Sequence, residues 1–134
     1  MTLPPRFPIT EDQIDRIVAT FYARIRRHDI LGPVFANHVT DWPEHEAKIA
    51  RFWRKAILGQ PAYDGNPMQV HRAAGDVKPE HFAHWLALFD DTLTKSLPEH
   101  QAASWSALAH RIGRGLRLGV EEDTRPTGAP PSLR

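Results

Sequence analysis

The chain has 134 residues, a formal net charge of +1 and no cysteine. This length fits one domain, and 41% apolar with 25% charged residues is a globular composition. The balanced charge gives no electrostatic reason to bind nucleic acid. The missing cysteines exclude disulfides, thiolate metal sites and thiol catalysis, and they fit a cytoplasmic location. Because no segment reaches about 20 apolar residues and the N-terminus lacks a signal-peptide pattern, we expect no membrane partner.

The first predicted helix begins at Thr10, whose spacing to Gln13 is that of a capping box. Tyr22 lies at the edge of the helix's apolar stripe, so its hydroxyl can reach the core. Leu31-Gly32-Pro33 has the composition of a turn, which predicts that the helix ends near Asp29. The stripe that faces the core consists of Ile14, Ile17, Val18, Phe21 and Ile25.

A second helix is predicted from Asp41 to Gly59, and its inward face begins with His45 and is otherwise apolar. The turn residues 63–67 then predict a short helix that runs through His71. After it, residues 73–76 are small and polar, which predicts a loop.

Two more long helices follow. One begins near Pro79 and carries Phe82 and Trp85 on its apolar face, and the other is predicted to begin with Ser96 as its cap and Glu99 three residues later. No alternating strand pattern is present, so the fold is predicted to be all-α. We expect an N-terminal extension over residues 1–9, one domain over 10–120 and a disordered proline-containing tail over 121–134.

The polar residues that helical spacing places near the interior are Tyr22, His45, His71 and Trp85. They include two imidazoles and no carboxylate. No phosphate-binding loop, Gly-x-Ser-x-Gly, His-Glu-x-x-His or paired-carboxylate pattern is present, so hydrolase and kinase activities lack support. Each of the four residues taken singly is explained by a hydrogen bond inside a helical core. A helical domain without any cofactor therefore stays open as an alternative.

A zinc site is a second alternative, since His81 and His84 are three residues apart. Neither histidine points clearly inward. Without cysteines or a helical glutamate partner, the spacings typical of zinc sites are not met.

A haem site explains more of the polar set than zinc does. Haem iron needs one axial imidazole, a flat apolar slot and hydrogen-bond donors beside its open position. His71 could supply the imidazole, and Tyr22, His45 and Trp85 could face a bound ligand. The slot could be made by Phe35, Ile49, Phe52, Trp53 and Phe82.

Four motifs in order also resemble the truncated haemoglobins, specifically their third group. FYARIRRHDILGPVF at 21–35 is similar to the family's Phe-Tyr pair followed by Leu-Gly-Pro-x-Phe. WPEHEAKIARFW at 42–53 is similar to its Trp-x-x-His helix, YDGNPMQVH at 63–71 to its Tyr-x-Gly-x-Pro segment, and HFAHWLALF at 81–89 to its Phe-x-x-Trp-Leu helix. The resemblance covers residues of about 12 to 118.

The resemblance implies a shortened globin fold with two helices packed over two around a non-covalent haem b. It implies that His71 is the proximal iron ligand and that Tyr22, His45 and Trp85 are the distal polar residues. By the same resemblance, Phe35 contacts the haem edge. Ile49 is implied to lie over the iron, with Trp53 further along the distal helix.

The expected ligands are O2, NO and CO, with cyanide or peroxide as further candidates. Donors beside a ligand favour its retention, so we expect ligand chemistry, such as NO detoxification or a peroxidase-like reaction, rather than O2 delivery. A catalytic globin would need an unidentified reductase, and no reductase segment is found in this chain. A non-catalytic oxygen- or NO-binding or sensing globin is therefore the alternative from another class, and enzyme status stays open.

Overall fold

The computed structural model describes residues 6–61, 63 and 65–123. These residues form helices and no strand, which confirms the all-α class. Residues 1–5 of the predicted extension and 124–134 of the predicted tail lie outside the described residues. None of the described helices is long and apolar enough to cross a membrane. The helices are α1 (Glu11–Ile25), α2 (Leu31–Ala36), α3 (Trp42–Leu58), α4 (Pro67–Ala74), α5 (Pro79–Ser96) and α6 (Glu99–Asp123).

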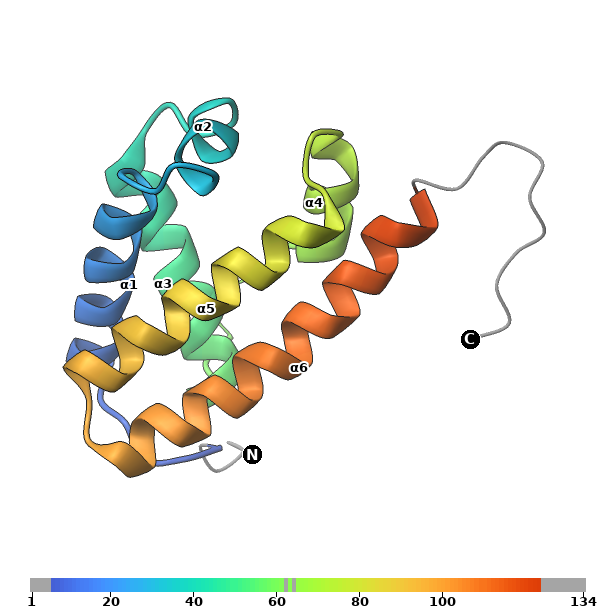
Figure 1. The fold of residues 1–134 in the computed structure, drawn as a ribbon. Coiled ribbons are helices and arrows are strands. Elements are labelled where there is room, and N and C mark those ends of the chain that lie inside the picture. The colour runs from blue at the N-terminus through green and yellow to red at the C-terminus, as the bar shows by residue number, and fades with distance from the viewer. Residues whose placement is uncertain (1–5, 62, 64, 124–134) are drawn as a thin grey trace.

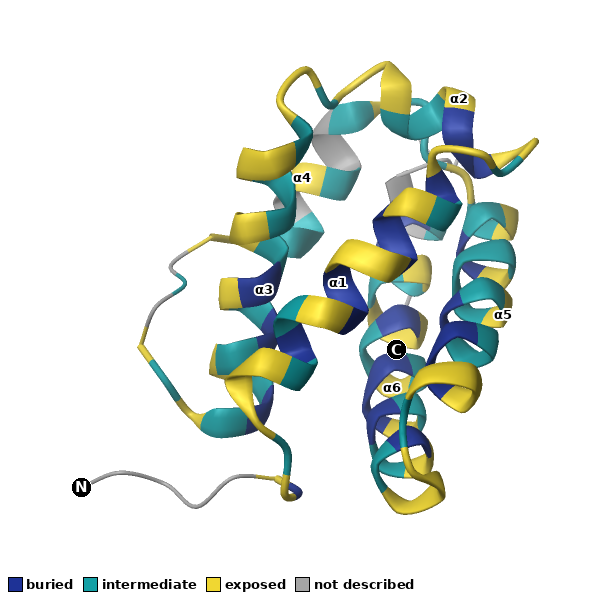
Figure 2. Ribbon diagram, turned by 90° about the vertical axis from the view of Figure 1, so that its left-hand side faces the viewer, coloured by how far each residue is buried: buried dark blue, intermediate teal, exposed yellow. Residues whose placement is uncertain are grey.

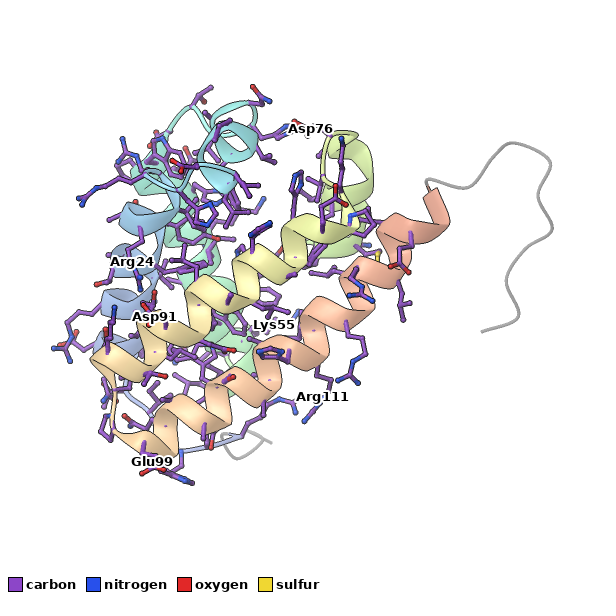
Figure 3. All side chains as sticks on the ribbon, viewed as in Figure 1. Arg24, Lys55, Asp76, Asp91, Glu99 and Arg111 are labelled. Carbon is purple, nitrogen blue, oxygen red and sulfur yellow. The ribbon has the colours of Figure 1, made fainter. Side chains whose placement is uncertain are left out.

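Two pairs of helices make the body of the fold: α1 packs on α3, and α5 packs on α6 (Figure 1). The pairs are joined where α1 crosses α5, and there Arg24 Nη2 lies 2.7 Å from Asp91 Oδ2 (Figure 3). The buried positions of the four helices face one another between the pairs (Figure 2). This is the predicted arrangement of two helices over two. The largest fully buried side chains include Trp105, Phe21, Phe89, Ile14 and Ile25.

The short helix α4 lies beside α6, on the side of the body away from α1 (Figure 1). Among the described residues it packs against α6, and no Cα–Cα distance of 8 Å or less joins it to α3 or to any other helix. The helix that carries His71 is therefore not packed, backbone to backbone, against the helix that carries His45.

Two predicted helix starts are confirmed by their hydrogen bonds. Gln13 N donates to Thr10 Oγ1 at 3.1 Å and Thr10 N donates to Gln13 Oε1 at 3.0 Å, which completes the capping box of α1. Glu44 N donates to Asp41 Oδ1 at 3.1 Å at the start of α3. Gly59, at φ 74°, ends α3 in the left-handed conformation that glycine adopts without steric cost.

The turn predicted at Leu31-Gly32-Pro33 is wrong, because these residues form the first turn of α2. Pro33 is tolerated there, since the first amides of a helix have no partner within the helix. His28 Nδ1 instead accepts from two of the amides at this end, Ile30 N and Leu31 N, each at 3.1 Å. The His28 side chain thus stabilises the start of α2, a helix that composition alone does not indicate.

Two other predicted boundaries are also wrong. The short helix does not stop before residue 73 but runs through Ala74, and Gly75, at φ 78°, follows it. Ser96 does not cap the last helix but is the final residue of α5. Leu97 precedes a proline and is therefore extended (φ −128°, ψ 155°), so α6 begins only at Glu99.

Candidate functional site

His71 has a fixed orientation within α4. Its Nδ1 lies 2.5 Å from the carbonyl oxygen of Pro67, the first residue of the helix. Because a carbonyl oxygen can only accept, Nδ1 carries the proton and the lone pair of Nε2 is available. No described residue makes a hydrogen bond to Nε2. This is the arrangement of an imidazole prepared to bind a metal through Nε2.

Phe82, in the first turn of α5, is the aromatic neighbour of His71. The two ring centroids are 5.7 Å apart at an interplanar angle of 40°. Phe82 is buried, whereas His71 is half-buried. The Phe82 ring thus extends the apolar surface beside the imidazole of His71.

Tyr22 lies in a cluster of rings on the other side of the fold, which we call the distal cluster: Tyr22, Phe35, Trp42 and His45. The Tyr22 ring is 5.0 Å from His45 and 5.8 Å from Phe35, and Tyr22 is buried. Burial raises the pKa of the Tyr22 hydroxyl, a hydrogen bond with Trp85 opposes this rise, and the Glu46 charge adds to it. The hydroxyl therefore stays protonated and is able to donate.

His45 has a ring nitrogen without a hydrogen-bond partner among the described residues. Its Nε2 atom is buried, and no bond to it is formed by the part of the chain that the structure describes. Burial lowers the pKa of His45, and the charge of Lys48 lowers it further. A neutral imidazole with an unsatisfied buried nitrogen is a group placed for a partner that the protein itself does not supply.

Trp85 joins the distal cluster to the core. Its ring is 4.9 Å from Phe21, edge to face, and 4.9 Å from Phe89, stacked at 24°. Its indole N–H is a donor only, and its interaction with the Tyr22 hydroxyl lowers the pKa of that hydroxyl against the larger effect of burial. Tyr22 is thus a neighbour of both His45 and Trp85.

The apolar residues predicted for the slot lie in two different surroundings. Phe35, Ile49 and Phe52 are half-buried at the edge of the core. Trp53 is inside it, stacked on Phe89 with ring centroids 5.7 Å apart and an interplanar angle of 9°. Trp53 therefore supports its neighbour Phe52, 5.0 Å away, from the core side.

The zinc alternative gains no support from the described residues, which contain no group of three or more metal-binding side chains. His81 Nδ1 accepts from Lys78 N at 3.0 Å and caps α5. His84 instead faces His28, with ring centroids 5.8 Å apart.

One member of the distal cluster was not among the residues predicted for the site. The Trp42 ring lies 6.0 Å from His45 and 6.5 Å from Tyr22, and Arg26 Cζ lies 4.9 Å above it. The signal was present in the sequence, because residues three apart share one face of a helix. Trp42 precedes His45 by that spacing.

A polar contact connects α2 to the segment that follows α4. Asn37 Nδ2 donates to Asp76 Oδ2 at 3.1 Å, and His38 Nε2 lies 2.5 Å from Asp76 Oδ1. Asp76 lies on the side of α4 that faces α2 (Figure 3). His38 and Asn37 hold the pKa of the Asp76 carboxyl below its usual value. The contact thus joins the distal side of the molecule to the segment carrying His71.

Comparison with known proteins identifies this arrangement. The family model described as bacterial-like globin matches residues 10–112. The chain belongs to the bacterial-like globin family. A group 3 truncated hemoglobin from Campylobacter jejuni is 35% identical over 89 residues, which are 63% of this chain and 70% of that protein. The crystal structure of a group III truncated hemoglobin from the same species superposes with a TM-score of 0.80 at 29% identity, covering 90% of this chain and 95% of that one.

These matches confirm the predicted resemblance to the group III truncated haemoglobins and the shortened globin fold. Haem binding, and with it the binding of small diatomic ligands such as O2, follows from membership of the globin family. The residues of the site fit that cofactor. His71 offers an unshared Nε2, the distal cluster holds the unpartnered Nε2 of His45, and α4 and α3 are not packed on each other.

Proposed function

We propose that this globin holds a non-covalent haem b through His71 Nε2 and performs chemistry on diatomic ligands rather than delivering O2. When bound, the haem supplies an iron that coordinates O2, NO or CO and exchanges electrons. One observation carries the proposal: Nδ1 of His71 is held by Pro67 at 2.5 Å, which leaves Nε2 for the metal. The absence of cysteine supports non-covalent attachment.

The apolar side chains proposed to contact the porphyrin come from three helices. Phe82 extends the surface beside His71, and Trp53 supports the slot from the core through Phe52. Their burial would exclude water from the cofactor's faces and strengthen polar contacts there. The remaining members of the slot are Phe35, Ile49 and Phe52.

Tyr22 is proposed to donate its hydroxyl proton to the partly negative outer atom of the ligand. The raised pKa of Tyr22 keeps this proton in place, and Trp85 is proposed to hold the oxygen that carries it. His45 would contribute a second polar contact through the Nε2 atom that has no described partner. Such contacts slow ligand loss, which suits a reaction on the ligand and opposes delivery.

NO dioxygenation is the reaction that we propose first. It converts NO and O2 to nitrate and consumes one electron, which a separate reductase would supply. A peroxidase-like reaction is the second candidate, since a donor beside a peroxide assists its cleavage. Cyanide would then bind as an inhibitor. A cysteine-free chain suits the reducing cytoplasm, where such an electron donor is found.

The test is NO consumption by the haem-loaded ferrous protein with O2 and a regenerating reductant, with nitrate as the measured product. Repeated turnover that falls in Tyr22→Phe would support NO dioxygenation. Turnover of hydrogen peroxide with a reducing dye, without nitrate formation, would favour the peroxidase-like reaction. Ligand binding without turnover in either assay would contradict an enzymatic role and favour a binding or sensing globin.

A further inference from the structure

The distal cluster is layered from the core to the solvent. Tyr22 is buried, His45 and Trp42 are half-buried, and Arg26 is exposed. The three rings are mutual neighbours: His45 lies 5.0 Å from Tyr22 and 6.0 Å from Trp42, and Tyr22 lies 6.5 Å from Trp42. Trp42 is thus the ring of this cluster that an exposed charged side chain covers.

Arg26 holds Trp42 by two attractions. Its guanidinium carbon lies 4.9 Å from the centre of the Trp42 ring, which is the geometry of a cation–π contact. The same charge acts on the carboxyl of Glu46, whose pKa burial raises and Arg26 lowers. Arg26 therefore lies over an aromatic face and is attracted by the charge of Glu46.

His45 can satisfy its buried Nε2 with water only if the ring moves outward. The rings that contact His45 are those of Tyr22, Phe35 and Trp42. Tyr22 is inside the core, so an outward movement of His45 has to pass the half-buried rings of Phe35 and Trp42, and Trp42 is the one that Arg26 covers. A movement past Trp42 would break the contact between Trp42 and Arg26.

We propose that Arg26 and Trp42 close the entrance to the distal pocket and set the rate at which diatomic ligands enter and leave it. Arg26 is a positioning residue, because it acts through Trp42 and does not touch the ligand. This inference rests on the proposed function, since it assumes a ligand-binding haem beneath His45.

An entrance has a kinetic signature that a hydrogen-bond donor lacks. Opening is a barrier common to both directions, so its loss raises the association and dissociation rates by the same factor and leaves Kd unchanged. A donor that contacts the ligand changes mainly the dissociation rate of O2. The two roles are thus separated by measuring both rates for O2 and CO.

The experiment compares haem-loaded Arg26→Gln with Arg27→Gln, a matched control that removes the neighbouring exposed charge. Flash photolysis and stopped flow give association and dissociation rates for CO and O2. Arg26→Gln is expected to raise both rates by about two- to fivefold, which is the factor for loss of an exposed cation–π contact. Arg26→Lys should restore rates near those of the unmodified protein, and Trp42→Ala should exceed Arg26→Gln.

A second measurement does not depend on haem. Diethyl pyrocarbonate modifies accessible imidazoles, and peptide mass spectrometry reports its rate of reaction at His45. Arg26→Gln is expected to raise this rate by the same factor as the ligand rates, and Arg27→Gln to leave it unchanged. His100, which is exposed on α6, serves as the internal reference.

The inference is overturned if Arg26→Gln and Arg27→Gln give the same rates, or if Arg26→Gln changes the dissociation rate of O2 alone. Unchanged rates would point to another route, such as the groove of about 340 Å³ between α1 and α3 whose lining includes Val18 and Ala50. A chain without a Soret band after haem is added overturns the proposed function. In that case, the closing role of Arg26 would also be overturned if diethyl pyrocarbonate modified His45 at the same rate in Arg26→Gln as in the unmodified protein.

Discussion

The Nδ1 atom of His71 lies 2.5 Å from the carbonyl oxygen of Pro67, four residues earlier in the same helix. A histidine that donates its second ring N–H to a carbonyl has a fixed tautomer and a more basic Nε2. The protein's own backbone thus leaves Nε2 as the ring nitrogen of His71 that is able to bind a metal. Pro67 has this role because it lies one helical turn before His71 on the same face of α4.

Removing the Tyr22 hydroxyl tests the donor. Tyr22→Phe keeps the buried ring and its contact with His45, and it deletes only the O–H group. Loss of one hydrogen bond to the ligand predicts O2 dissociation faster by about five- to tenfold. CO is less polar, so its dissociation rate should change little. Equal changes for the two gases would show that Tyr22 contributes packing alone.

Trp85 is expected to act through Tyr22. Trp85→Phe removes the indole N–H and leaves an aromatic ring on Phe21 and Phe89. The single variant should speed O2 dissociation less than Tyr22→Phe does. The double variant should match Tyr22→Phe, because interactions within one network are not additive. Additive effects would instead place Trp85 in direct contact with the ligand.

The lowered pKa of His45 predicts that the stability of the fold depends on pH. Burial lowers the pKa of His45 in the folded protein below the usual 6.5, which applies to the unfolded chain. Between the folded and the unfolded pKa, the unfolded chain therefore binds more protons than the folded one. Stability should therefore fall as pH falls below about 6.5. Thermal unfolding between about pH 8 and pH 5 should give a flatter profile for His45→Gln than for the unmodified protein. Superimposable profiles would contradict the lowered pKa.

Asp76 is predicted to help retain the haem. Asp76→Asn weakens the contact with His38 and Asn37, which joins α2 to the segment after α4. Because the contact is half exposed, haem transfer to an excess of a haem acceptor should accelerate by no more than about fivefold. Since the pKa of Asp76 is lowered, the contact should persist in mild acid and be lost only as pH falls through that pKa. Asp29→Asn, on an exposed residue, is the control, and an equal acceleration in both variants would contradict the role.

The long helices were predictable because their signals are local. Thr10 with Gln13, and Asp41 with Glu44, mark helix starts by bonds that span three residues, and the structure contains those bonds. The burial of Tyr22 was also predictable from its place beside the apolar stripe of α1.

The errors occurred where one side-chain contact or one proline overrides what the composition of the segment suggests. The start of α2 depends on the ring of His28, and composition alone suggested a turn there. Ser96 has the right spacing to Glu99 for a cap, but Pro98 forces Leu97 to be extended and α5 continues through Ser96. Arg26 lies at the end of α1 and covers Trp42 at the start of α3, so the pattern of neither helix alone indicates this contact.

The most direct test of the central claim is the absorption spectrum of the ferrous, ligand-free protein after haem is added, compared with that of His71→Ala. We predict a Soret band and five-coordinate imidazole ligation in the unmodified protein. These features should persist in His100→Ala, which changes an exposed histidine of α6. His71→Ala should lose the haem or the imidazole signature and regain the signature with added imidazole. An unchanged ferrous spectrum in His71→Ala would contradict the assignment of His71 as the axial ligand.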